Sequence, residues 1–307
     1  MRTVAAILAV AVSPFVSTPA SAVQASVTAD SGAGVGILVM AHGGTPEWDR
    51  AILESVAPLA AQTPTVVALG MADHAAMASA LDSLARTGVE RVAVVRLFIS
   101  GASFLDQTNY FLGLSPEPPA PIAGHAGHGG GQGPATPGPI AHGLAIATHA
   151  EGLMGAAEVS QIVGQRAAEI SSLPANESVL LIAHGMGAEH ENEAVLEAMR
   201  DAADRMAPRG FARIGVATLR EDWPEQRERE EASIRTFVER ESALGRRVLV
   251  IPYRLHGFGP YASVLEGESY EPGDALVPHP GVTEWIARTA TRVSLSQGWG
   301  DPFAGDR

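Results

Sequence analysis

Two histidines and an acidic pair each follow a short run of apolar residues in the second half of the sequence. The histidines are His184 and His256, and the acidic pair is Glu221-Asp222. Such runs are typical of buried parallel strands, whose carboxyl ends meet at one edge of a sheet. We therefore expect His184, Glu221 and His256 to converge in one crevice. Imidazole and carboxylate donors suit divalent cobalt, nickel, iron, zinc or copper, so these three residues are predicted metal ligands and catalytic groups. The alternative for each histidine is a hydrogen bond to the backbone.

The loop around His256 carries further side chains suited to a ligand. It contains Arg254, Phe258 and Tyr261, with glycines between them that permit sharp turns. The guanidinium of Arg254 is suited to pair with the carboxylates of an anionic ligand. Phe258 and Tyr261 are suited to stack on a flat macrocycle, with packing in the protein core as their alternative. These three residues are the predicted ligand-binding set.

An internal repeat organises the chain. The apolar run that ends in His42 and a glycine recurs as the run that ends in His184 and a glycine, and two later strand-like runs recur in the same order. A further match pairs His149 with His279, each placed shortly before a helical stretch. Two copies of one pattern predict two similar domains.

Helical patterns lie between the strand-like runs, most clearly at 75–86 and 225–241. Strands that alternate with helices indicate βαβ units and parallel sheets. The sequence therefore predicts an α/β fold with two tandem domains, at 33–172 and 176–296, each a mainly parallel sheet flanked by helices.

The two repeats differ in their potential metal ligands. Ser100 stands in the first repeat at the position that His256 occupies in the second, so His42 lacks the partner that His184 has. A hydroxyl is a weak neutral donor for these metals compared with an imidazole. We therefore predict that the main site lies in the second half, that metal binding depends on this half more than on the first, and that His42 is an additional ligand.

The first repeat also carries extra residues near 116–143. This segment is rich in proline and glycine, which is typical of a flexible loop without stable packing. It contains His125 and His128, which are suited to weak metal capture or are incidental histidines of a solvated loop.

Composition excludes several kinds of chemistry. The chain has 307 residues, a formal net charge of −13 and no cysteine, and all 21 basic residues are arginine. Without cysteine or lysine there is no thiol nucleophile, iron–sulfur cluster, Schiff-base lysine or nucleotide-binding P-loop lysine. An acidic chain without a basic cluster is a poor nucleic-acid binder and a reasonable partner for cations.

The amino-terminal segment has the pattern of a secretory signal peptide. Arg2 precedes the apolar run 4–12, and Ala20-Ser21-Ala22 fits the small-residue cleavage rule. We predict that 1–22 is a signal peptide and that the mature protein is exported, to the periplasm or beyond, without membrane insertion; a buried first strand or helix is the alternative.

The sequence resembles the class II tetrapyrrole chelatases, specifically the CbiX-like sirohydrochlorin cobaltochelatase/ferrochelatase family, in a tandem two-domain form. The resemblance lies in three motifs: the His-Gly pair after an apolar strand (His42 and His184), the carboxylate after a later strand (Glu221), and the histidine after a Val-x-Pro strand (His256). It implies a chelatase-like fold with His184, Glu221 and His256 in the metal-site roles.

The resemblance implies a lyase that inserts Co²⁺, Fe²⁺ or Ni²⁺ into a tetrapyrrole such as sirohydrochlorin, with no nucleotide cofactor. A second hypothesis is an exported metal- or tetrapyrrole-binding protein that keeps the fold without turnover. A third, a hydrolase that uses Ser100 or Ser103, is weak because neither serine lies in a G-x-S-x-G motif.

Overall fold

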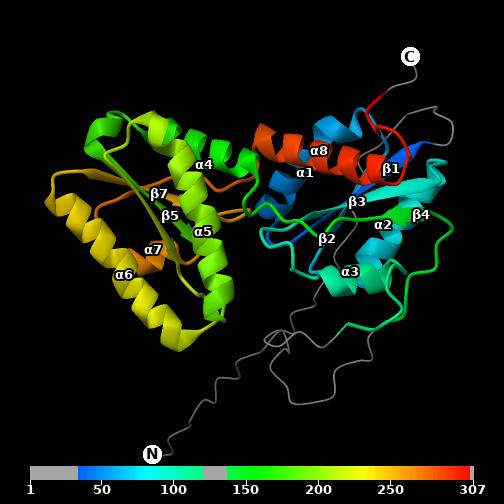
Figure 1. Ribbon diagram of the computed structural model, residues 1–307, viewed down its shortest axis with the longest axis horizontal. Helices are drawn as coiled ribbons and strands as arrows, with labels where there is room; N and C mark the ends of the chain where they lie inside the picture. The colour runs from blue at the N-terminus through cyan, green and yellow to red at the C-terminus, as the bar shows by residue number, and fades with distance from the viewer. Residues whose placement is uncertain (1–33, 120–136, 305–307) are drawn as a thin grey trace, which may run out of the picture.

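The computed structural model describes residues 34–119 and 137–304, and these residues form two parallel β-sheets flanked by helices (Figure 1). Each sheet has four strands, in the order β2-β1-β3-β4 and β6-β5-β7-β8. Every strand pair is parallel, which confirms the predicted fold class. The strands are β1 (Val35–Ala41), β2 (Thr65–Leu69), β3 (Arg91–Leu97), β4 (Ala145–Ala147), β5 (Glu177–Ala183), β6 (Arg213–Thr218), β7 (Arg247–Pro252) and β8 (Glu271–Pro272).

Helices connect successive strands, and local capping defines several of their first turns. The side chains of Thr45 and Asp73 cap α1 and α2 by accepting a backbone N–H from the first turn of each helix. Proline occupies the first turn of α1, α6 and α8, where its missing N–H is tolerated. The helices are α1 (Pro46–Ala60), α2 (His74–Arg86), α3 (Leu105–Phe111), α4 (Ala157–Ile170), α5 (Glu189–Met206), α6 (Pro224–Ala243), α7 (Tyr261–Val264) and α8 (Pro280–Ser296).

The central strands are apolar because helices cover both of their faces. All seven residues of β1 and all seven of β5 are buried. A strand covered on both faces needs a continuous apolar run rather than an alternating one, and the sequence shows such a run throughout β1 and over 179–183 of β5. In the described part of the chain, no helix is both long and apolar enough to cross a bilayer.

The last helix of each repeat packs on the sheet of the other repeat. α4 follows β4 of the first sheet but lies against β7 and α5, and α8 follows β8 of the second sheet but lies against β1, β3 and α1 (Figure 1). α4 and α8 also contact each other, and one continuous apolar core runs through both halves. The sequence repeats 33–172 and 176–296 are therefore not the packing units, because each of them contributes a helix to the other.

The strand registers show which residues of the two repeats correspond. β3 pairs with β1 in the register with which β7 pairs with β5, so Ser100 occupies the position of His256. Met154 and Val277 donate equivalent backbone hydrogen bonds just before α4 and α8. Ala156 is therefore the counterpart of His279, and the predicted match of His149 with His279 is wrong.

The structure describes only part of the predicted loop at 116–143. Residues 120–136, with His125 and His128, lie outside the described residues, as does the predicted signal peptide 1–22. The end of the segment is packed: Ile140 is buried in the apolar core and its backbone N–H donates to Phe111. The prediction that the whole segment lacks packing is therefore wrong for this stretch, because an apolar side chain anchors it.

Candidate functional site

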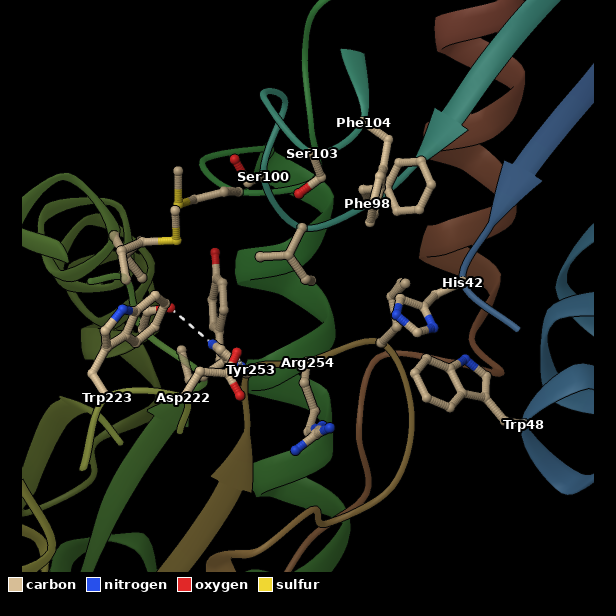
Figure 2. A pocket seen from close by; sticks show the side chains of 18 residues that line it. His42, Trp48, Phe98, Ser100, Ser103, Phe104, Asp222, Trp223, Tyr253 and Arg254 are labelled. Atoms are coloured by element: carbon tan, nitrogen blue, oxygen red, sulfur yellow. Dashed lines mark hydrogen bonds and ion pairs between the residues drawn. The ribbon is translucent and has the colours of Figure 1, made fainter. Parts of the chain in front are cut away.

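A cavity of about 360 Å³ lies between the two halves, at the carboxyl ends of the strands. Its polar lining side chains are His42, Ser100, Ser103, His184, Asp222 and Arg254, and its apolar wall includes Trp48, Phe98, Trp223 and Tyr253. Figure 2 shows His42 and Trp48 on one side of the cavity, Asp222 and Trp223 on the other, and Arg254 between the two groups. The site is thus shared between the repeats rather than confined to the second one.

The two cavity histidines have the same orientation. Nδ1 of His42 lies 2.8 Å from the carbonyl oxygen of Gly43, and Nδ1 of His184 lies 2.9 Å from that of Gly185. Because a carbonyl oxygen only accepts, each Nδ1 must carry the proton and donate it. This leaves Nε2 of each neutral imidazole as the free lone pair, which is the arrangement typical of metal-binding histidines.

His184 and Asp222 form a close polar pair. Nε2 of His184 lies 3.2 Å from Oδ2 of Asp222, and both side chains are accessible to solvent. In the neutral imidazole with Nδ1 protonated, both facing atoms carry lone pairs and repel each other. The pair is therefore favourable only with a proton or a metal cation between the two atoms, so these residues are suited to bind a divalent cation.

Glu221 is held by Arg254. Nη1 of Arg254 lies 3.2 Å from Oε1 of Glu221, and the two side chains are only 23% and 15% exposed. The guanidinium also lies over the ring of Tyr261, 5.8 Å from its centroid. Burial, and next the negative charge of Glu221, raise the pKa of the Tyr261 phenol, so it stays protonated beside the pair. The predicted ligand Glu221 is thus engaged in an ion pair.

His256 points toward the first half. Its ring stacks on Trp48 at 5.8 Å between centroids and 15° between planes, and Trp48 also stacks on His42 at 5.0 Å and 10°. Burial, and next the positive charge of Arg254, lower the pKa of His256, which favours the neutral ring in this stack.

The expected convergence of His184, Glu221 and His256 is not present in the structure. No group of three or more His, Cys, Asp or Glu side chains in the described ranges is arranged to hold a metal ion. The physical reasons are the two competing contacts: Arg254 attracts Glu221, and Trp48 attracts the ring of His256. The two-residue site of His184 and Asp222 remains.

Phe258 and Tyr261 pack in the protein core, which was the alternative to a role in ligand binding. Phe258 stacks on Tyr270 at 5.8 Å and 10°, and both it and the fully buried Tyr261 pack with the apolar core of the second half. Neither lines the cavity, so their predicted role as stacking platforms does not match the structure. The predicted ligand-binding residue Arg254 does line it.

The aromatic walls of the cavity come instead from Trp48 and Trp223. A Cβ on Gly44 would lie 2.3 Å from the Trp48 ring, and a Cβ on Gly187 would lie 2.4 Å from the Trp223 ring, so each indole needs its glycine. The sequence contained a signal for both walls. Trp223 directly follows Asp222, and Trp48 lies in the first turn of the helix after His42.

Arg96 holds in place the segment of the cavity wall that contains Ser100 and Ser103. This fully buried residue donates to the carbonyl oxygens of Gly101, at 2.9 Å, and of Ser103. The hydroxyl of Ser100 accepts a backbone N–H from Ala102. In the described part of the chain neither serine hydroxyl is bonded to a histidine or a carboxylate, so the geometry gives no support to the hydrolase hypothesis.

Solved structures with a similar fold indicate the fold family of this chain. The SirB protein from Bacillus subtilis with Fe³⁺ matches with a TM-score of 0.57 and 13% identity, over 87% of this chain and 99% of that one. The sirohydrochlorin chelatase SirB from Bacillus subtilis subspecies spizizenii in complex with cobalt matches with a TM-score of 0.53 and 12% identity, over the same shares. This chain has the fold of the class II chelatases.

A third chelatase-like structure agrees. DR2241 from Deinococcus radiodurans, a multi-domain protein with structural similarity to chelatases, matches with a TM-score of 0.54 and 17% identity, over 85% of this chain and 55% of that one. No protein-family model and no curated protein sequence matches the chain. The low identities mean that the chelatase fold is shared, while the roles of individual residues must come from the geometry of this site.

Proposed function

We propose that this protein is a chelatase that inserts a divalent cation, Co²⁺, Fe²⁺ or Ni²⁺, into a tetrapyrrole such as sirohydrochlorin. The observation that carries the proposal is the pair of equivalent histidines, His42 and His184, whose Nε2 lone pairs are left free beside one cavity between the halves. One SirB structure with this fold is with Fe³⁺, and the structure of the sirohydrochlorin chelatase SirB is in complex with cobalt.

The metal, which is a substrate, would bind between Nε2 of His184 and the carboxylate of Asp222. These atoms are 3.2 Å apart, so a cation that enters needs only a small outward movement of two accessible side chains. A neutral nitrogen and a carboxylate oxygen are suitable donors for Co²⁺, Fe²⁺ and Ni²⁺. With only two protein donors, the metal keeps open positions for the pyrrole nitrogens.

Insertion of a divalent cation releases two pyrrole N–H protons, so the site needs a base. Nε2 of His42 carries the lone pair for this step, because the ring proton is on Nδ1, which donates it in a hydrogen bond to the carbonyl oxygen of Gly43. Trp48 stacks on His42 at 5.0 Å and keeps its ring in this orientation. The released protons then pass to water at the exposed edge of the cavity.

The macrocycle would meet an aromatic wall and a cation. Trp48, Trp223 and Phe98 offer flat apolar surface, and Arg254 offers a guanidinium for peripheral carboxylates. A ring of four pyrroles is larger than a cavity of about 360 Å³, so it enters edge-first or the two halves separate to admit it.

The test is metal insertion followed by absorption spectroscopy. Full-length protein, Co²⁺ and an excess of metal-free sirohydrochlorin should give many metallated products per protein, and His184→Ala should lower the rate at least tenfold. Spectral change that stops at one equivalent would instead support the hypothesis of a binding protein without turnover. A rate equal to the protein-free control, without binding of either component, would exclude both.

We also propose that the mature protein is exported, on the strength of the signal-peptide pattern in 1–22. Amino-terminal sequencing of the secreted protein should begin at Val23. A retained, uncleaved amino terminus in the cytoplasm would contradict this proposal.

A further inference from the structure

The ion pair between Arg254 and Glu221 joins a residue that lines the cavity to one that does not. Arg254 lies on the cavity wall, whereas Glu221 lies behind it, and their contact is 3.2 Å long. Both side chains are mostly buried, at 23% and 15% exposure. Each charge offsets the cost of burying the other. Separation of the two groups is therefore unfavourable, since an unpaired charge in a largely apolar wall is costly.

The backbone around Arg254 is built to hold the guanidinium in place. Gly259 has a φ of +64°, and a Cβ at this position would lie 1.8 Å from Nη1 of Arg254. The ring of Tyr261 lies under the guanidinium, 5.8 Å away. The planar group is thus enclosed by a glycine backbone, an aromatic ring and one carboxylate, which leaves the cavity as its open side.

Glu221 lies next to the cation-binding pair. Its backbone N–H donates to the carbonyl oxygen of His184 at 3.2 Å, and the next residue, Asp222, contacts the His184 imidazole. Glu221 directly precedes Asp222, the carboxylate proposed to bind the metal, so a Glu221 side chain that is released from Arg254 lies close to the cation. It can then add a second carboxylate to the His184–Asp222 site.

We propose that Arg254 is a coupling residue, which holds Glu221 away from the metal until a carboxylate of the macrocycle takes the guanidinium. A ligand carboxylate can occupy two parallel N–H donors, whereas Glu221 is bonded at one. The exchange removes the cost of an unpaired guanidinium and frees Glu221 for the cation. Anion binding at Arg254 and cation binding at His184–Asp222 thus strengthen each other, and by linkage the coupling is reciprocal.

This inference deepens the proposed function and rests on it, but its central test needs no turnover and no macrocycle. The measurement is the Kd of Co²⁺ by calorimetry at pH 7.5 for full-length wild type, Arg254→Gln, Glu221→Gln and the double variant. Release of Glu221 should make Arg254→Gln bind Co²⁺ about tenfold more tightly than wild type. The gain should disappear in the double variant compared with Glu221→Gln.

The double variant distinguishes the proposed coupling from the electrostatic effect of losing the positive charge of Arg254 near the cation. If loss of a positive charge alone strengthens cation binding, the gain will persist when Glu221 is Gln, and the proposal is overturned. Arg235→Gln, which removes a cation that pairs with Glu268 away from the cavity, is the matched control and should have no effect.

A second experiment tests whether a carboxylate ligand bound at Arg254 strengthens the binding of Co²⁺. Copper(II) uroporphyrin is an octacarboxylate macrocycle whose centre is already filled, so it can occupy Arg254 without accepting Co²⁺. It should tighten Co²⁺ binding about tenfold in wild type and not in Arg254→Gln, after subtraction of Co²⁺ binding to the macrocycle alone. Equal effects in both proteins overturn the coupling. Absence of Co²⁺ binding in every variant would instead contradict the proposed function.

Discussion

His149 shows how a single buried residue links stability to pH. Its Nε2 accepts the backbone N–H of Arg96 at 3.0 Å, which requires an unprotonated nitrogen. Burial, and next the positive charge of Arg96, lower the pKa of His149 to about 4. The unfolded chain takes up this proton near pH 6.5 and the folded chain only near pH 4, so protonation favours unfolding.

The free energy of unfolding should therefore fall as pH decreases from about 6.5, by about 2 kcal/mol at pH 5 from His149 alone. Replacement by Gln keeps an acceptor for the Arg96 N–H without the titration. Urea denaturation of wild type and His149→Gln at pH 7.5 and pH 5 should show a smaller pH-dependent loss in the variant. Equal losses in both proteins would show that His149 is not the source.

The glycines of the His256 loop provide a matched pair of substitutions. Gly257 and Gly259 have φ values of +71° and +64°, so alanine at either position is strained by about 1 kcal/mol. A Cβ on Gly259 also meets Nη1 of Arg254, whereas a Cβ on Gly257 meets nothing within 4 Å. Only Gly259→Ala should displace the guanidinium.

We expect Gly259→Ala and Gly257→Ala to lower thermal stability, and only Gly259→Ala to change the Kd of Co²⁺, toward tighter binding, because Glu221 loses its partner. Melting curves and calorimetry on both variants check this. An identical change in Co²⁺ affinity in the two variants would show that loop strain, and not Arg254, controls the metal.

At the scale of secondary structure, α4 and α8 each pack on the sheet of the other repeat, so the stability of each sheet depends on a helix from the other repeat. α8 lies against β1 and β3, and α4 lies against β7. Trp285 of α8 is 1% exposed, and Val163 of α4 is fully buried. Each of these buried side chains thus belongs to a helix that covers the sheet of the other repeat.

Trp285→Ala should lower the free energy of unfolding by about 3–5 kcal/mol. Amide hydrogen exchange should show the loss of protection first in β1 and β3, although Trp285 belongs to the second sequence repeat. Val163→Ala should have the opposite distribution, with β5 and β7 affected first. If protection is lost only in the sheet of the repeat to which the substituted residue belongs, the result would contradict the role of α4 and α8 in stabilising the sheet of the other repeat.

At the scale of the whole molecule, the cavity joins two unequal histidines. His184 has a carboxylate at 3.2 Å, whereas His42 stacks on Trp48. A neutral imidazole with a nearby carboxylate binds a divalent cation better than an imidazole alone. We therefore continue to predict that metal binding depends more on the second half than on the first.

Calorimetric titration with Co²⁺ should show at least tenfold weaker binding in His184→Ala and a smaller loss in His42→Ala. His190→Ala, at an exposed position on α5, is the control and should bind as wild type does. A larger loss in His42→Ala would place the metal in the first half. Equal losses would place it between the two histidines.

The apolar runs were sufficient to predict the repeat and the strands β1, β2, β3, β5, β6 and β7, but not the short strands β4 and β8. β1 and β5 bury every residue, so their apolar runs and the His-Gly pairs after them are local signals that need no long-range contact. The same signals placed His42 and His184 at strand ends, and the register of the strands confirms that Ser100 stands in the place of His256.

The tertiary structure alone decided which side chains meet. The ring of His256 lies on Trp48, the carboxylate of Glu221 lies on Arg254, and α8 lies on the first sheet, although all three belong to the second repeat. Each outcome is a competition between partners distant in sequence, decided by stacking, charge pairing or apolar burial. Residue spacing fixes the strand end at which a side chain emerges, but the partner that it contacts depends on how the two halves pack.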